Sequence, residues 1–433
     1  MIFEILTTGI MGGIAAKAFI KKNGLVSNDS GKIQRIFSLS GLNVKDGKDT
    51  LTTKLIKKKE YSWGWEFKYK IPLGRSFDDY LNKQRILEDG LNNRRKKITI
   101  NDLKSLQLDE NIIDNVKEMW NNKLTQSKEL ELSFDGLLIL RVYNEPLPTQ
   151  VDFKASERWK FNVGQIRENN QLITHDFEQI PHLVIGGATR YGKSNLINSI
   201  ITSLLLQKPN DVKFHLVDLK GGIELGDYEN LKQTVSIAYE PEQALLTLKN
   251  ACDAMRDTQM TLKRMGKKKV QDAGIKTRHF IIIDEVGELN PKEGVGKDDR
   301  ELKQQCQTYM SQISRLGAGL GFRLILATQY PVGDTIPRQC KANADAKLSF
   351  RVQSEVASRV ALDEGGAEKL PQIRGRAIYQ TGDGRKTLQT QLITSEDIEN
   401  AIKPHIIIKE VKPIEKEIIN SERRNDIVSF EKI

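Results

Sequence analysis

Short apolar runs alternate with longer amphipathic stretches through the middle of the chain. Each run is about five residues long and is dominated by Val, Ile and Leu, which is typical of strands buried on both faces of a sheet. The runs occupy residues 182–186, 212–218, 279–284 and 323–329. Helical stretches such as 195–206 separate them. This alternation predicts a doubly wound α/β domain with a parallel sheet and a ligand at the carboxyl ends of the strands.

The first run leads into a glycine-rich loop that reads G-x-x-x-x-G-K-S. Such a loop turns backbone N–H groups onto phosphate oxygens and sets the lysine against the β/γ-phosphates, while the Ser hydroxyl ligates Mg²⁺. The pattern therefore predicts a site for ATP and Mg²⁺. Its residues are Gly187, Ala188, Thr189, Arg190, Tyr191, Gly192, Lys193 and Ser194.

The run at 279–284 ends in two acidic residues, as a Walker B strand does. Asp284 is predicted to hold the Mg²⁺ shell, and Glu285 to orient and deprotonate the attacking water, because phosphoryl transfer depends on positioning and charge neutralisation. A core strand that ends in a solvated Asp-Glu pair is the structural alternative. The last run ends at Gln329, which we predict senses the γ-phosphate.

Several blocks of sequence together resemble the FtsK/SpoIIIE family of DNA-pumping ATPases. The resemblance covers roughly residues 160–395 and includes the phosphate loop and the Asp284-Glu285 pair. The remaining blocks are Pro181-His182-Leu183, Ala327-Thr328-Gln329 with Pro331, Lys341-Ala342-Asn343, Phe350-Arg351-Val352, Ser358-Arg359 and Leu362-Asp363 through Leu370.

The resemblance implies a RecA-like motor, a ring of six subunits with ATP between neighbours, and DNA threaded through the middle. Such rings complete each site with an arginine from the next subunit. Arg351, Arg359 and Arg315 are the candidates, in that order. Each of them could equally be a surface ion-pair partner.

Departures from the chromosome-pumping members bear on what is moved. Tyr330 replaces the usual arginine after Ala-Thr-Gln, and residues 374–377 depart from the family's Gly-Asp segment. The charged tail at 396–433 is too short for a winged-helix DNA reader. The chain thus looks more like the FtsK-type coupling proteins of Gram-positive conjugative elements, which implies relaxase and transfer-channel partners. A single-motor ATPase of a protein-secretion system and a soluble plasmid or phage factor for replication or partition are the alternatives.

Composition agrees with a polyanionic partner. The 67 Lys and Arg exceed the 57 Asp and Glu, for a formal net charge of +10, an excess that favours nucleic acid or another acidic surface. Lysine and arginine cluster at 57–59, 94–97 and 264–269, and we expect the third cluster to reach phosphates. Three cysteines without metal-ligand spacing indicate a reduced, cytosolic domain.

The amino-terminal part is predicted to differ from the motor. Residues 5–20 are mostly apolar, and we favour a membrane anchor within 1–24 over a soluble amphipathic helix. Residues 25–155 read as a small α+β accessory domain with strands at 63–71 and 136–143 and a helix at 77–92. Its aromatic stripe, Trp63, Trp65, Phe67 and Tyr69, is either a packed sheet face or a nucleic-acid platform, and we favour the packed face. The motor is assigned to residues 156–395.

Overall fold

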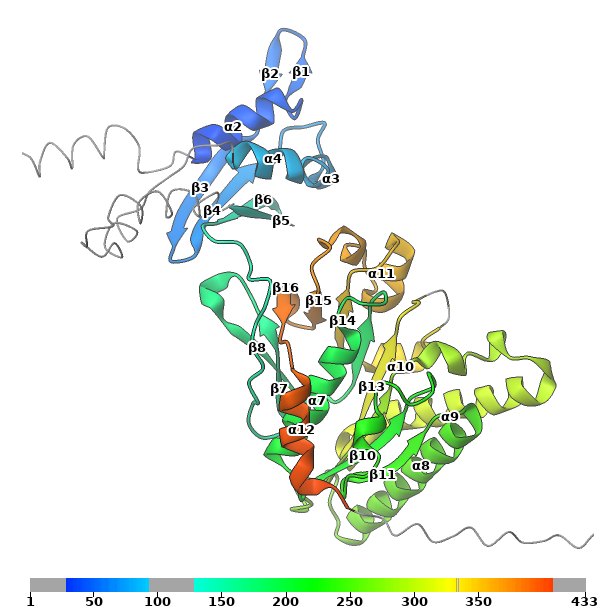
Figure 1. The fold of residues 1–433 in the computed structure, drawn as a ribbon. Helices are drawn as coiled ribbons and strands as arrows, with labels where there is room; N and C mark the ends of the chain where they lie inside the picture. The colour runs from blue at the N-terminus through cyan, green and yellow to red at the C-terminus, as the bar shows by residue number, and fades with distance from the viewer. Residues whose placement is uncertain (1–28, 93–127, 332, 334, 408–433) are drawn as a thin grey trace, which may run out of the picture.

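The computed structural model describes residues 29–92, 128–331, 333 and 335–407. These residues form a large mixed sheet flanked by helices and a smaller four-stranded sheet with its own helices (Figure 1). Residues 5–20 and 408–433 lie outside the described part, so the predictions made for them remain predictions. Within the described residues, no helix is both long enough and apolar enough to span a membrane.

The large sheet has ten strands in the order β11-β10-β12-β13-β9-β14-β15-β16-β7-β8. Neighbours from β11 to β14 pair in parallel, and those from β14 to β8 pair antiparallel. The predicted α/β class with a parallel sheet is therefore confirmed. The parallel strands are β11 (Thr234–Ala238), β10 (Val212–Val217), β12 (Arg278–Ile283), β13 (Phe322–Thr328), β9 (Leu183–Gly186) and β14 (Ala346–Phe350). The antiparallel strands are β15 (Arg376–Thr381), β16 (Gly384–Thr390), β7 (Lys160–Gln165) and β8 (Leu172–Asp176).

Helices cover both faces of the parallel strands, which explains why the central strands β9, β12 and β13 are largely apolar. Successive residues of β12 enter different cores: Phe280 and Ile282 pack with one helix layer, whereas Ile281 and Ile283 pack with the other. The first layer holds α7 (Lys193–Gln207) and α12 (Ser395–Ile402), and the second holds α8 (Pro241–Arg264), α9 (Gly296–Leu320) and α10 (Arg338–Asn343). A short helix, α11 (Glu355–Leu362), lies beside β14.

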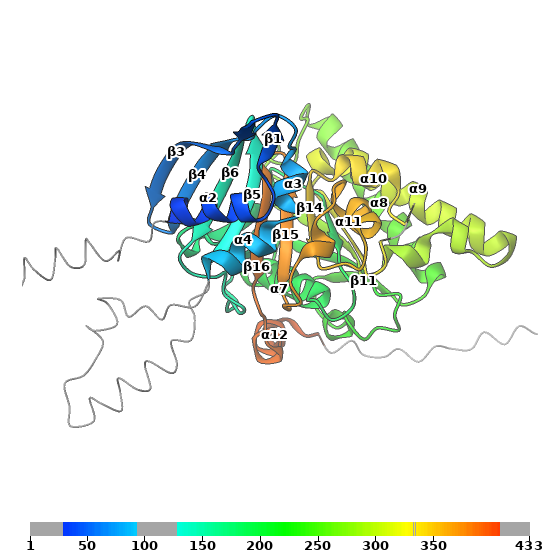
Figure 2. The same ribbon diagram turned by 90° about the horizontal axis from the view of Figure 1, so that it is seen from above.

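The small domain is a four-stranded antiparallel sheet in the order β3-β4-β6-β5 with helices on one face (Figure 2). Phe67 and Tyr69 of the sheet pack against Ile33 and Phe37 of the first helix. The strands are β3 (Lys54–Tyr61), β4 (Gly64–Lys70), β5 (Glu129–Asp135) and β6 (Leu137–Tyr143), with an added hairpin of β1 (Val44–Asp46) and β2 (Asp49–Leu51). The helices are α2 (Asp29–Leu39), α3 (Phe77–Leu81) and α4 (Gln84–Leu91).

Two predictions for this domain need correction. The single helix predicted at 77–92 is two helices, because Lys83 adopts φ −103° and ψ 5° and interrupts the helical backbone. The aromatic stripe also does not share one face. Phe67 and Tyr69 are buried in the core as favoured, but Trp63 lies in the β3–β4 turn and stacks on Tyr61, with a ring-centroid distance of 4.8 Å.

The ordered chain also continues beyond the boundary at 395. Asn195 of α7 donates to the carbonyl of Ile393 at 2.9 Å, and Ile402 of α12 is buried in the core around α7. Ile406 then forms a bridge with Leu231. Residues 396–407 therefore belong to the motor and not to a charged tail, because their apolar side chains complete one of its cores.

Candidate nucleotide site

The glycine-rich loop lies between β9 and α7 and has an unusual backbone. Gly187, Arg190 and Gly192 have positive φ angles of 156°, 74° and 117°. A Cβ on Gly187 would stand 2.7 Å from the Cβ of Phe350, so only glycine fits there. Arg190 holds a left-handed conformation that most residues avoid, and such strain concentrates at functional sites. The loop therefore has the conformation of a phosphate cradle.

Backbone donors in this loop suit an anion. The amide of Ala188 donates to the carbonyl of Arg351 at 3.0 Å, and that of Tyr191 donates to Ala188. The amides of Thr189, Arg190 and Gly192 have no acceptor among the described residues. They stand at the amino-terminal end of the 15-residue helix α7, where the helix dipole favours negative charge. These residues fit the phosphates of a nucleotide.

Lys193 and Asp284 meet at the centre of the site, and both are buried. The Lys193 ammonium donates to the carbonyl oxygen of Asp284 at 2.9 Å and also to its carboxylate Oδ1. Burial raises the pKa of Asp284, and the ammonium of Lys193 opposes that rise. Because carboxylate Oδ2 is buried without a hydrogen-bond partner among the described residues, Asp284 retains an oxygen for Mg²⁺, a cation that takes oxygen ligands.

The Glu285 carboxylate, only 3% exposed, is held from two sides. Lys220 donates to its Oε2 at 3.0 Å, and the backbone amide of Gln329 lies 3.2 and 3.0 Å from its two oxygens. Two fixed donors set the orientation of the carboxylate, as a residue that positions an attacking water requires. Glu285 and Asp284 are thus a buried pair, and the solvated alternative does not apply.

Gln329 connects the loop to Glu285. Its strand, β13, lies between β9 and β12, so its carboxyl end falls between the phosphate loop and the acidic pair. The Gln329 side-chain oxygen accepts a hydrogen bond from the Thr189 hydroxyl at 3.1 Å, while the Gln329 backbone N–H donates to the Glu285 carboxylate. A change at the loop can therefore reach the acidic pair through one residue.

Among the described residues, none of the three candidate arginines forms a hydrogen bond or ion pair with Lys193, Asp284 or Glu285. The Arg351 guanidinium donates to the carbonyl of Leu370 within the same chain, next to the chain's own phosphate loop. Arg359 is exposed on α11 and pairs with Glu355 at 2.7 Å. Arg315 is exposed on α9. An arginine that completes a neighbour's site must be able to leave its own surface, and this favours Arg359 and Arg315 over Arg351.

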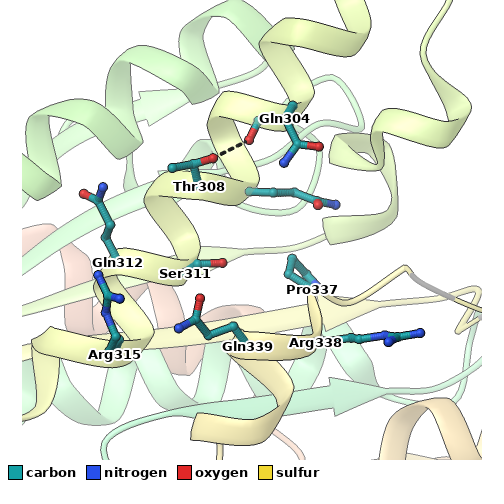
Figure 3. A pocket seen from close by; sticks show the side chains of 9 residues that line it. Gln304, Thr308, Ser311, Gln312, Arg315, Pro337, Arg338 and Gln339 are labelled. Carbon is teal, nitrogen blue, oxygen red and sulfur yellow. Dashed lines mark hydrogen bonds between the residues drawn. The ribbon is translucent and has the colours of Figure 1, made fainter.

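Arg315 lies along a polar groove of about 440 Å³ between α9 and the segment leading into α10 (Figure 3). Amide and hydroxyl side chains line the groove together with Arg315 and Arg338, and none of the described residues that line it is acidic. Thr308 donates to the Gln304 carbonyl at 2.9 Å within the helix wall. The groove therefore suits an anionic or carbonyl-rich partner surface.

Sequence reasoning missed Asp218 and Lys220. The Asp218 carboxylate accepts from the amides of Glu224 and Leu225 at 2.9 Å and from the Lys220 amide at 3.3 Å. These bonds fold residues 218–225 into a tight loop that aims Lys220 at Glu285. The available signal was an acid at the end of β10 followed by Leu-Lys-Gly-Gly.

Comparison with known proteins yields one matching family model, the FtsK/SpoIIIE family, at residues 149–289. The DNA translocase FtsK of Chlorobaculum tepidum is 33% identical over 219 residues, which are 47% of this chain and 26% of that protein. The DNA translocase SpoIIIE of Bacillus subtilis is 27% identical over 297 residues, 64% of this chain and 36% of that protein. The chain thus spans about a quarter to a third of these relatives.

Two solved structures share the fold. The pCW3 conjugation coupling protein TcpA, a monomer with ATPγS, matches with a TM-score of 0.58 at 20% identity, covering 87% of this chain and 99% of that chain. The cytoplasmic domain of the type VII secretion ATPase EccC from Thermomonospora curvata matches with a TM-score of 0.50 at 22% identity, covering 60% of this chain and 33% of that one.

Proposed function

We propose that this chain, whose residues 149–289 match the FtsK/SpoIIIE family model, is an ATP-driven DNA translocase that acts as a coupling protein in conjugative transfer. One observation carries the proposal: a phosphate loop, a buried carboxylate with a free oxygen and a doubly held glutamate converge at adjacent strand ends. Those groups match the requirements of ATP hydrolysis.

In the proposed mechanism, Lys193 leaves Asp284 for the β/γ-phosphates of ATP, and the loop amides hold the phosphate oxygens. Ser194 and Asp284 would hold Mg²⁺, which when bound would neutralise negative charge on the phosphates. Glu285 takes the proton of the attacking water. Gln329 contacts both Thr189 of the phosphate loop and Glu285, so its position couples the presence of the γ-phosphate to the orientation of Glu285. Hydrolysis then drives movement along DNA.

The active assembly is proposed to be a ring of six copies, with Arg359 or Arg315 of one subunit reaching the site of the next. The motor is placed in the cytoplasm, tethered to the membrane by residues 5–20, with a relaxase and transfer-channel proteins as partners. The likeness to TcpA, which covers nearly all of both chains, supports the conjugative assignment over the chromosome-pumping one.

The test is the ATPase rate of the full chain with double-stranded DNA, with single-stranded DNA and without nucleic acid. Glu285→Gln provides the blank. Stimulation by either form of DNA supports the translocase and identifies its track. A rate indifferent to nucleic acid contradicts it and favours the secretion ATPase, which the fold shared with EccC keeps as the second candidate. Stimulation in a chain that does not fractionate with membranes favours a soluble plasmid or phage factor.

A further inference from the structure

The β3–β4 hairpin of the small domain carries lysines on one face. In β4, Phe67 and Tyr69 point into the core under the helices, so Lys68 and Lys70 point to the opposite face of the sheet, where Lys68 is half-buried and Lys70 exposed. Lys54 stands directly opposite Lys70, and Lys57 directly opposite Lys68, across a bulge at Ile56. Lys59, opposite Glu66, extends the row. We call Lys54, Lys57, Lys59, Lys68 and Lys70 the lysine face.

The opposed lysines of the hairpin lower the stability of the folded domain. Like charges directly opposite each other in an antiparallel pair destabilise the sheet, and this hairpin contains two such pairs. The nearby acid, Glu66, is engaged by Arg141 at 3.2 Å and lies 3.9 Å from Lys68. Among the described residues, no carboxylate pairs with Lys54, Lys57, Lys59 or Lys70, and these four are exposed. The lysines therefore serve something other than the stability of the domain.

The contacts with the motor leave this face accessible. Ser62 in the hairpin turn donates to Asn169, and the Tyr143 hydroxyl donates to Glu168 at 3.0 Å, so the motor touches the turn end of the hairpin. Lys54 and Lys70 stand at the other end. Because β3 is the outer strand of its sheet among the described residues, the row also lies along the edge of that sheet (Figure 2).

The row suits a linear polyanion. Residues two apart on a strand are roughly 6.8 Å apart, and paired strands are about 4.8 Å apart, so the lysines form two close parallel rows. One strand of DNA presents a phosphate about every 3.4 Å along its axis, and lysine contacts phosphate without reading sequence. Membrane-surface binding usually adds a broad apolar face, whereas Ile56 is the one strongly exposed aliphatic residue of β3.

We propose that the lysine face is a second DNA-contact surface, outside the motor, which holds the phosphate backbone of the DNA that the motor moves. The inference rests on the proposed DNA translocation. With this surface, the small domain would keep the DNA bound between successive steps of the motor.

The test uses the full chain carrying Lys54→Gln, Lys57→Gln and Lys70→Gln. Lys68 and Lys59 stay, because Lys68 lies near Glu66 and Lys59 contacts the Tyr61 ring at 4.5 Å. The matched control changes three exposed lysines elsewhere on the same domain to Gln: Lys32, Lys45 and Lys48. Binding of a fluorescent DNA duplex is measured by anisotropy between about 50 and 200 mM salt.

The lysine-face variant is expected to lower the slope of log K against log salt by about 2 to 3, while the control stays within about half a unit of the wild type. Its melting temperature stays level or rises, since the like-charge pairs are gone, and its basal ATPase rate is unchanged. If the lysine-face variant and the control variant show the same slope of log K against log salt while DNA still stimulates the ATPase, the inference is overturned and the proposed function stands.

Two other outcomes also decide the matter. Binding to vesicles rich in anionic lipid that is lost in the lysine-face variant, with an unchanged DNA slope, identifies a membrane surface as the partner and overturns the inference. A wild-type chain that neither binds DNA nor responds to it overturns the inference and the proposed function together.

Discussion

The two ends of the parallel sheet both carry buried charged groups, but the carboxylates at the two ends differ in how many hydrogen bonds they make. At the amino end, both Glu178 oxygens are satisfied: Arg278 donates at 2.8 and 3.0 Å, Arg323 at 2.8 Å and Gln271 at 2.7 Å. At the carboxyl end, Asp284 keeps a buried oxygen that has no hydrogen-bond partner in the described part of the chain. A carboxylate with both oxygens paired holds strands together, even though Arg323 Nε beside it is buried without a partner among the described residues. A buried carboxylate with an unpaired oxygen is available for a ligand.

The pKa values express the same difference. Burial alone would raise the pKa of Glu178, yet the hydrogen bonds and charges of Arg278 and Arg323 lower it to about 2. At Asp284, burial outweighs the single lysine and the pKa rises. The charged form of Glu178 is therefore stabilised by its arginines, although burial lowers the pKa of Arg323. The carboxyl end carries an electrostatic cost that a metal ion would relieve.

The largest effect is expected from Glu285→Gln at the carboxyl end. Loss of a general base lowers turnover by about 10²–10⁴-fold, while ATP binding and folding stability stay close to wild type, since Gln329 can still donate to the amide oxygen. Single-turnover hydrolysis and ATP titration measure the two quantities. Lys193→Ala is the contrast, because it should weaken binding as well as turnover. Full turnover in Glu285→Gln would show that the base is another residue.

The next largest effect is expected from acid, which should lower the folding stability of the chain through two histidines at the amino end of the sheet. Burial lowers the pKa of His182 and of His279 from 6.5 to about 4. The unfolded chain then binds more protons than the folded chain between those values. Stability is therefore full above pH 6.5 and falls as the pH drops toward 4, by about 1.4 kcal/mol per pH unit for each histidine.

Urea unfolding across this pH range measures the slope. His182→Gln removes a buried acceptor for the Leu324 amide and lowers stability at neutral pH, but its slope below pH 6.5 should be shallower by about 1.4 kcal/mol per pH unit. An unchanged slope would mean that His182 titrates alike in both states.

Glu178→Gln tests the paired end directly. It leaves two buried arginines without their carboxylate and should destabilise the chain by about 2–3 kcal/mol, somewhat less than a fully buried pair because the Glu178 side chain is 25% exposed. ATP affinity should not change. The matched control is Glu301→Gln, whose exposed pair with Lys297 should contribute below about 0.5 kcal/mol. Equal losses in the two variants would refute the assigned difference between buried and exposed pairs.

The smallest effect is expected at Lys220. Lys220→Met removes one of the two donors to Glu285 and should lower kcat about tenfold with little change in KM, because the phosphate loop is untouched. Lys220→Arg keeps the charge and should retain most of the activity. A rise in KM with constant kcat would instead indicate a role in nucleotide binding.

Much of the fold was predictable from local pattern. Strands buried on both faces appear in the sequence as apolar runs, and a phosphate loop has a fixed spacing. The positions of β9, the loop and α7 were therefore predicted to within a few residues. The break in the helix at Lys83 was not predictable, because the helical pattern runs through it without proline or a strong stop signal. The packing of Ile402 was missed for a similar reason: a short apolar stretch among charges does not reveal which core it joins.

Local motifs in the sequence are enough to predict the chemistry of the site, because the residues that cradle phosphate, hold Mg²⁺ and activate water follow one another at fixed spacings. The coupling between these residues depends on the tertiary structure. Lys220 reaches Glu285 only because β10 and β12 are neighbours, and Gln329 joins the loop to Glu285 only because β13 lies between β9 and β12. The opposed lysines of β3 and β4 likewise depend on register. Strand order and register follow from packing across the whole sheet, which no local pattern encodes.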